Sequence, residues 1–99
     1  MIKDNQISIK KIPTLLNKDY QFIDLRDPFE YKKIHLTNFI NIPYENFDLN
    51  HYHFSKEEPI ILICYSGAKS KKLADELCNQ GYQAYSIKGG FYTILHHKT

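Results

Sequence analysis

At the centre of this chain stands the stretch Pro59-Ile60-Ile61-Leu62-Ile63-Cys64-Tyr65-Ser66-Gly67-Ala68-Lys69-Ser70. Its first half is a continuous apolar run that enters on a proline, which is typical of a central strand covered on both faces in a parallel sheet. Its second half has a glycine three positions after Cys64 and predicts a tight turn into a helix that begins near Ser70. A strand joined to a helix in this way is the repeating unit of an α/β fold.

Further strands are expected around this one. Apolar runs predict strands over Tyr20–Leu25, Asn38–Ile42 and Gln83–Ile87, and Gln6–Ser8 is expected to add an edge strand. These runs alternate with segments of helical periodicity. The alternation predicts an α/β fold with a parallel sheet.

The clearest helix start lies at Asp27. Asp27 is a favoured N-cap, Pro28 follows at the first helical position, and Glu30 stands at the third. This is the capping-box arrangement, in which the two side chains satisfy exposed backbone donors. The helix is expected to be short and to end near Lys33.

The other helices have fewer residues that mark where they start and stop. After Cys64, one apolar stripe is formed by Leu73, Ala74 and Leu77. Gly81 is the expected C-terminal stop of that helix. A short helix is predicted over residues 13–16, and residues 44–58 are predicted to be a loop with one helical turn. Gly89 and Gly90 are expected to break the chain before a last apolar segment.

Composition excludes several classes of protein. The 99 residues, 42% of them hydrophobic, are predicted to form one domain over residues 1–99. A net charge of +2 with scattered lysines does not favour nucleic acid as a partner. No run approaches the roughly 20 apolar residues of a membrane-spanning helix. The N-terminus has no apolar run of a secretory signal, so we expect a cytoplasmic protein.

Two cysteines are too few for a disulfide framework, and they lack metal-site spacing. In a reducing compartment both Cys64 and Cys78 are expected to be free thiols. Cys64 would lie at the carboxyl end of a sheet, where ligands bind in open α/β folds. Backbone N–H groups of the turn, the following helix start and the Lys69 charge would favour its thiolate. A buried cysteine without chemistry remains the alternative.

The turn resembles the active-site loop of the rhodanese family, commonly written Cys-Arg-x-Gly-x-Arg-Ser/Thr. The resemblance extends along the chain. Residues 22–31 are similar to the family's Asp-Val-Arg-x-x-x-Glu-Tyr segment, and His35 with residues 38–43 resembles its Gly-His-Ile…Ala-x-Asn-Ile-Pro segment. Residues 68–81 look like the family's helix, and residues 87–91 resemble its closing Leu-x-Gly-Gly signature. The resemblance implies a three-layer fold with a mostly parallel five-stranded sheet flanked by helices.

The resemblance also implies a reaction. Cys64 would be the nucleophile, taking a sulfane sulfur from thiosulfate or a persulfide and passing it to a thiol or cyanide. A protein sulfur-relay partner is a further possibility, and no cofactor or metal is implied. The substrate-binding loop would comprise Tyr65, Ser66, Gly67, Ala68, Lys69 and Ser70, with Lys69 in the place of the loop arginine.

Two departures from the family pattern affect the expected substrate. Lys69 replaces an arginine, and an ammonium cannot reproduce the bidentate grip of a guanidinium on an oxyanion. Tyr65 replaces the other loop arginine and removes a second charge. Thiosulfate is therefore expected to be a weaker substrate than a neutral or smaller donor. Phosphatases of this fold have a loop one residue longer, which makes phosphoryl chemistry the less favoured alternative.

Other polar residues have two interpretations each. Asp24 and Arg26 either border the pocket or fix the neighbouring loops, and the second role is favoured. His35 is expected to be a structural histidine, and Cys78 a packed core or boundary residue rather than a resolving partner of Cys64. His51 and His53 lack further metal ligands nearby. For the whole protein, the alternative to a sulfurtransferase is a non-catalytic binding module of the same fold.

Overall fold

The computed structural model describes residues 4–97 and contains one sheet of five strands in the order β1-β5-β4-β2-β3. The strands are β1 (Gln6–Ile7), β2 (Gln21–Asp24), β3 (Ile40–Asn41), β4 (Ile60–Ile63) and β5 (Ala84–Ile87). Every pairing is parallel, and β4 lies at the centre with Ile60 opposite Gln21 on one side and Ala84 on the other. The expected parallel five-stranded sheet is confirmed.

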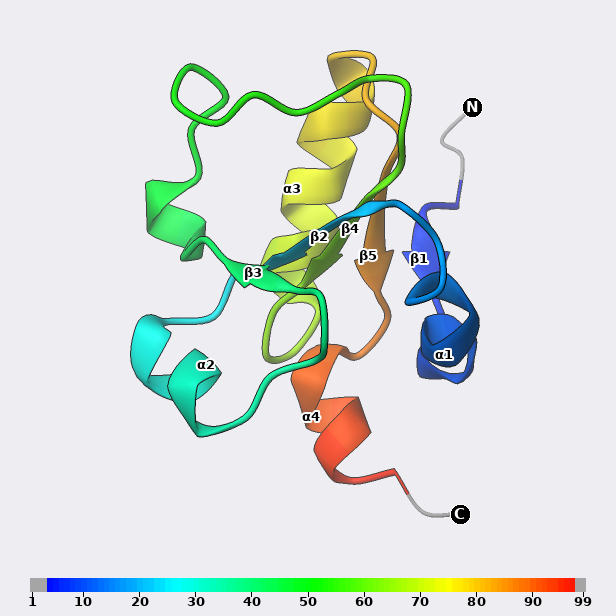
Figure 1. Cartoon of the computed structure of the whole chain (residues 1–99), viewed down its shortest axis with the longest axis vertical. Coiled ribbons are helices and arrows are strands. Elements are labelled where there is room, and N and C mark those ends of the chain that lie inside the picture. The colour runs from blue at the N-terminus through cyan, green and yellow to red at the C-terminus, as the bar shows by residue number, and fades with distance from the viewer. Residues whose placement is uncertain (1–3, 98–99) are drawn as a thin grey trace.

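Helical segments connect the strands. The α-helices are α1 (Ile12–Leu15), α2 (Pro28–Lys33), α3 (Ala68–Asn79) and α4 (Gly90–Leu95). Two 3-10 turns, η1 (Ile9–Lys11) and η2 (Tyr44–Asn46), complete the set. In Figure 1, α2 and α4 lie at the end of the sheet toward which the strand arrows point. Within residues 4–97, no helix is long and apolar enough to cross a membrane.

The central strand is buried on both faces, as its composition predicts. Leu62 packs in a cluster with Ile23, Leu73 and Leu77, which α3 and the loop after β3 cover. The neighbouring residues of β4 point to the opposite face because strand side chains alternate. There a second cluster contains Ile61, Ile63, Ile12, Phe22, Phe39, Ile87 and Phe91, drawn partly from α1 and α4. The sheet is therefore the middle of three layers.

The predicted N-cap of α2 at Asp27 is confirmed, but only one half of the capping box forms: within residues 4–97, the Glu30 side chain makes no hydrogen bond to the Asp27 N–H. Asp27 has extended backbone angles, and its side chain accepts a hydrogen bond from the Glu30 N–H at 3.0 Å. Pro28 occupies the first turn, and the helix ends at Lys33. Gly81 has a φ of +94° just beyond α3, which is the conformation expected of a helix-stopping glycine.

Several boundaries differ from the prediction. α3 begins at Ala68, two residues before the expected Ser70, because Gly67 already adopts the left-handed conformation that ends the turn. The strand expected over residues 38–42 is only two residues long, and Asn38 has a φ of +72°, which strand geometry excludes. The segment after Gly89 is the helix α4 rather than an unassigned apolar stretch.

Candidate active site

Cys64 follows directly after the last residue of β4 and is only 4% exposed. Its Sγ accepts hydrogen bonds from the Gly67 N–H at 3.1 Å and from the Ser70 N–H at 3.3 Å. Two donors from the backbone stabilise a negative charge on sulfur more than a neutral thiol, because charge-assisted hydrogen bonds are the stronger kind. The loop therefore forms a cradle around the Cys64 sulfur.

The cradle depends on glycine at position 67. Gly67 has a φ of +94° and directly precedes α3. A Cβ there would lie 3.0 Å from the backbone nitrogen of Gly89. Both the backbone conformation and the space thus require the absence of a side chain.

The first turn of α4 packs against the back of this loop. The Phe91 N–H donates to the Cys64 carbonyl at 2.9 Å, and the Tyr92 N–H donates to the Tyr65 carbonyl at 2.8 Å. Gly90 directly precedes these two donors with a φ of +62°, and a Cβ on it would be 2.4 Å from the Cys64 carbonyl oxygen. The carbonyl groups of Cys64 and Tyr65 are thereby turned toward α4, while the N–H groups of Gly67 and Ser70 face the sulfur.

Two buried serines lie behind the sulfur. Ser70 Oγ is 3.3 Å from Cys64 Sγ, donates to the Gly67 carbonyl at 3.2 Å, and is 2.6 Å from Ser86 Oγ. Ser70 and Ser86 are fully buried. The sequence indicated Ser70 but not Ser86, which stands in β5 directly before the signature over residues 87–91 and is not itself part of it.

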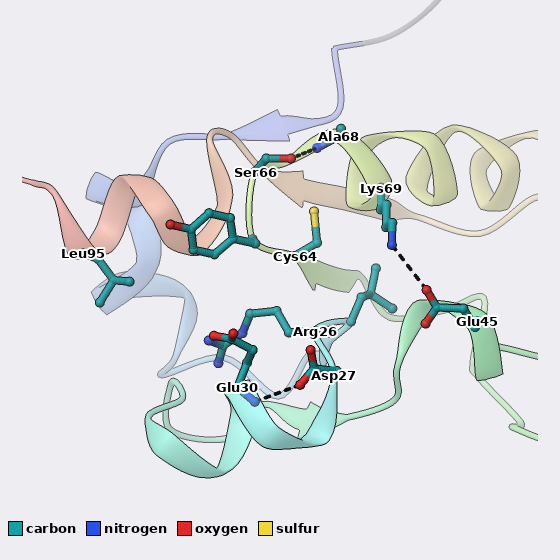
Figure 2. Close-up of a pocket in the computed structure, with 11 residues that line it drawn as sticks. Arg26, Asp27, Glu30, Glu45, Cys64, Ser66, Ala68, Lys69 and Leu95 are labelled. Atoms are coloured by element: carbon teal, nitrogen blue, oxygen red, sulfur yellow. Dashed lines mark hydrogen bonds and ion pairs between the residues drawn. The ribbon is translucent and has the colours of Figure 1, made fainter.

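An open cavity of about 640 Å³ lies over Cys64. Figure 2 shows Cys64 between the loop on one side and α2 on the other. Of the residues predicted for the site, the lining includes Cys64, Tyr65, Ser66, Ala68, Lys69 and Arg26. It also includes residues that sequence reasoning missed, namely Leu25, Asp27, Glu30, Glu45 and Leu95. Gly67 and Ser70 act through their N–H groups on sulfur and are absent from the lining.

Arg26 lines the cavity, but its side chain is buried and bonded to neighbouring residues. Its guanidinium makes a buried ion pair with Asp24 at 2.9 Å and donates to the Ile34 carbonyl at 2.7 Å. It also stacks over the Phe91 ring at 3.8 Å. Asp24 is fully buried and does not line the cavity. The geometry thus supports the loop-fixing role for Asp24, whereas Arg26 both fixes loops and borders the cavity.

Lys69 does not point at the sulfur. Its Nζ is 3.3 Å from Glu45 Oε2 and 5.4 Å from the centre of the Tyr44 ring, both in η2. Figure 2 shows this ion pair at the side of the cavity. A backbone hydrogen bond at Glu45 itself, and then the hydrogen bond from Lys69, lower the pKa of the Glu45 carboxyl. Both side chains of the pair are open to solvent.

Two of the remaining interpretations can be compared with the structure. His35 is exposed, stacks on Tyr31 and lies 2.8 Å from the Tyr31 carbonyl, outside the cavity lining, in agreement with a structural role. Cys78 is exposed, which corrects the expectation that it packs in the core or at its boundary. It lies just off the buried stripe at the far end of α3. That helix of 12 residues is about 18 Å long, too far for a disulfide with Cys64.

The chain matches the family model of the rhodanese-like domain over residues 9–97. It is 37% identical over 89 residues to the thiosulfate sulfurtransferase GlpE of Pseudoalteromonas translucida, covering 86% of this chain and 83% of that protein. It is 32% identical over 84 residues to the thiosulfate sulfurtransferase GlpE of Coxiella burnetii, covering 83% and 78%.

Solved structures agree in fold. A rhodanese-like domain protein from Staphylococcus aureus superposes with a TM-score of 0.79 at 26% identity, covering 89% of this chain and 88% of that one. The human single-domain sulfurtransferase TSTD1 superposes with a TM-score of 0.77 at 16% identity, covering 98% and 100%. The chain therefore belongs to the rhodanese-like domain family and is a rhodanese-type sulfurtransferase.

Proposed function

We propose that the chain carries sulfane sulfur as a persulfide on Cys64, taking it from thiosulfate or a low-molecular-weight persulfide and delivering it to a thiol or to cyanide. The observation that carries this proposal is the pair of backbone N–H groups that donate to Cys64 Sγ at the floor of an open cavity. A sulfur nucleophile that accepts two backbone hydrogen bonds and is reached through a cavity meets the requirements of covalent catalysis.

The proposed reaction has two displacements. In the first, the Cys64 thiolate attacks the sulfane sulfur, a bond from Sγ to that sulfur forms, and the bond to its carrier breaks. The carrier leaves with the electron pair, as sulfite from thiosulfate or as a thiolate from a persulfide. In the second, the acceptor attacks the terminal sulfur and Cys64 returns as a thiolate. No net oxidant or reductant is needed.

The loop serves both displacements through the same donors. The Gly67 and Ser70 N–H groups stabilise the thiolate before the first step and after the second. Within residues 4–97, the N–H groups of Tyr65 and Ser66 have no acceptor, so they remain available to the terminal sulfur or to a donor oxygen. The Cys64 and Tyr65 carbonyls share peptide planes with the Tyr65 and Ser66 N–H groups and are bound by α4, so little reorganisation of these two N–H groups accompanies the change in charge.

The proposed function also includes the domain, the compartment and the acceptor. Residues 1–99 would act as one domain, without a cofactor. A reducing, cytoplasmic compartment would keep Cys64 as a free thiol, the form found here. A small thiol or a protein relay partner would serve as acceptor. A non-catalytic binding function is not favoured, because the relatives of this chain are named as sulfurtransferases and the cradle contains a free thiol.

Intact mass measurement tests the proposal. After incubation with thiosulfate or a low-molecular-weight persulfide and removal of the excess, the protein is expected to gain the mass of one sulfur atom. Adding cyanide or a thiol should remove that mass. Failure of every donor to add sulfur would contradict the proposal.

The two cysteines provide matched controls. Cys64→Ala is expected to abolish the added mass, whereas Cys78→Ala is expected to retain it, because only Cys64 has the cradle. Sulfur that stays on the Cys64→Ala protein would place the chemistry elsewhere and overturn the assignment.

A further inference from the structure

The charges around the cavity do not match a doubly charged anion. Three carboxylates line it, Asp27, Glu30 and Glu45, against two cations, Arg26 and Lys69. Both cations are already paired, Arg26 with buried Asp24 at 2.9 Å and Lys69 with Glu45 at 3.3 Å. A dianionic donor that enters this cavity meets two carboxylates without a free cation among the lining residues to compensate.

Glu45 is the carboxylate that pairs with Lys69 at the side of the cavity. Lys69, in the first turn of α3, is the only cation among residues 64–70 and lies five positions along the chain from Cys64. Its ammonium is held at η2 by Glu45 and by the Tyr44 ring, and Figure 2 shows it beside the sulfur rather than over it. No motif in the sequence connects residue 45 with residue 69. The fold alone brings them together.

We propose that Glu45 is a specificity-determining residue, which, by holding Lys69 at η2, makes the Cys64 cavity select sulfur donors of low negative charge over dianions such as thiosulfate. This inference rests on the proposed sulfur transfer through Cys64. Glu45 acts on the donor through Lys69 and is therefore a positioning residue. When the carboxylate is removed, the flexible lysine is free to turn toward the cavity and to pair with an anionic donor.

A pair of donors with the same reacting sulfur measures this selection. Thiosulfate is a dianion and methanethiosulfonate is a monoanion, and each carries its sulfane sulfur on a sulfonyl group. The ratio of their kcat/KM values, with cyanide as the common acceptor, cancels changes that affect the chemical step for both donors equally. Glu45→Gln is expected to shift this ratio toward thiosulfate by about two- to fivefold, the size typical of a solvent-exposed charge pair.

The shift in the ratio of kcat/KM values should behave as an electrostatic effect. It is expected mainly in the KM for thiosulfate, because Lys69 would attract the donor before and during the reaction alike. It should also shrink toward zero at about 1 M salt, where charges are screened within about 3 Å. A structural disturbance of the cavity would instead change kcat for both donors and would not respond to salt in this way.

Two variants isolate the role of Glu45. Glu57→Gln makes the same change in net charge at an exposed position before β4, at the opposite end of the strand from Cys64, and should leave the ratio unchanged. In a Lys69→Gln background, Glu45→Gln should no longer shift the ratio. An unchanged ratio in Glu45→Gln, an equal shift in Glu57→Gln, or a shift that persists without Lys69 would each overturn the inference.

The test separates this inference from the function on which it rests. If the unmodified protein transfers sulfur from both donors while Glu45→Gln leaves the ratio unchanged, only the role of Glu45 is wrong. If the unmodified protein transfers sulfur from neither donor, the proposed function itself fails.

Discussion

The environment of the Cys64 sulfur is a short chain of polar groups that ends inside the sheet. Ser70 Oγ contacts Sγ, and Ser86 Oγ lies 2.6 Å behind it. When Ser86 donates to Ser70 Oγ, the hydrogen of Ser70 is available to the Gly67 carbonyl or, in the thiolate state, to the sulfur. A buried hydroxyl chain of this kind adapts to a change in charge without moving its heavy atoms.

Ser86→Ala is therefore expected to slow the uptake of sulfur by Cys64 by about fivefold, since one hydrogen bond contributes about 1 kcal/mol. Single-turnover mass measurement with a persulfide donor provides the rate. Ser55→Ala, at an exposed position before β4, is the control and should keep the original rate. Equal rates for Ser86→Ala and the unmodified protein would show that the hydroxyl chain does not assist the sulfur.

At the scale of elements, α4 supports the loop that bears Cys64. Its first N–H groups bind the loop carbonyls, and Gly90 makes the close approach between the two segments possible. Gly81, at the end of α3, also has a positive φ, but a Cβ there would meet only the flexible end of Lys56 at 3.6 Å. The two glycines share a backbone requirement and differ in what lies beside them.

Alanine substitutions at Gly81 and Gly90 can be compared directly. Gly81→Ala and Gly90→Ala should each lose about 1–2 kcal/mol of unfolding free energy to the left-handed backbone. Gly90→Ala should lose more stability than that and most of the sulfur-transfer rate, because its Cβ displaces the Cys64 carbonyl. Urea unfolding and the transfer assay measure the two effects. A Gly90→Ala protein as active as Gly81→Ala would disprove the supporting role of α4.

At the scale of the whole molecule, Asn5, which directly precedes β1, is joined to α3 by a contact between side chains far apart in sequence. Asn5 Nδ2 donates to Asp75 Oδ1 at 3.0 Å, and Lys71 Nζ pairs with the same oxygen at 2.6 Å. The hydrogen bond from Lys71, and then that from Asn5, lower the pKa of the Asp75 carboxyl. The charged form of Asp75 thus stabilises the folded state.

The lowered pKa of Asp75 determines how the stability of the protein depends on pH. Because the folded pKa lies below the ordinary value of 3.8, the contribution is present above that pH and is lost as the pH falls through the folded pKa. Asp75→Asn should lower the unfolding free energy at pH 7, and its difference from the unmodified protein should be smaller at a pH below 3.8. With Asp75 44% exposed, the effect is expected to be below about 1 kcal/mol.

Urea titrations at both pH values measure the Asp75 contribution. Glu76→Gln, next along α3, is the control, because Glu76 has no ion-pair partner within residues 4–97. A difference between Asp75→Asn and the unmodified protein that is the same at both pH values would rule out the carboxylate as its source.

The sequence by itself determined the features that neighbouring residues encode. The apolar run of β4, the cap at Asp27 and the turn from Cys64 to Gly67 each depend on a few adjacent side chains and on backbone sterics. Periodicity also indicated the stripe of α3, although it placed Cys78 too near the core. A position one residue from a buried stripe turns about 100° away from it in a helix.

Only the tertiary structure decided which distant residues meet around the sulfur and its cavity. The order β1-β5-β4-β2-β3 places β5 beside β4 and so brings Ser86 behind Ser70. The same packing sets the first turn of α4 under the loop, and it brings η2 to Lys69 so that Glu45 holds the charge the loop would otherwise direct at a donor. The physical reason is that pairing between distant segments depends on burial of the whole core and leaves no local pattern in the chain.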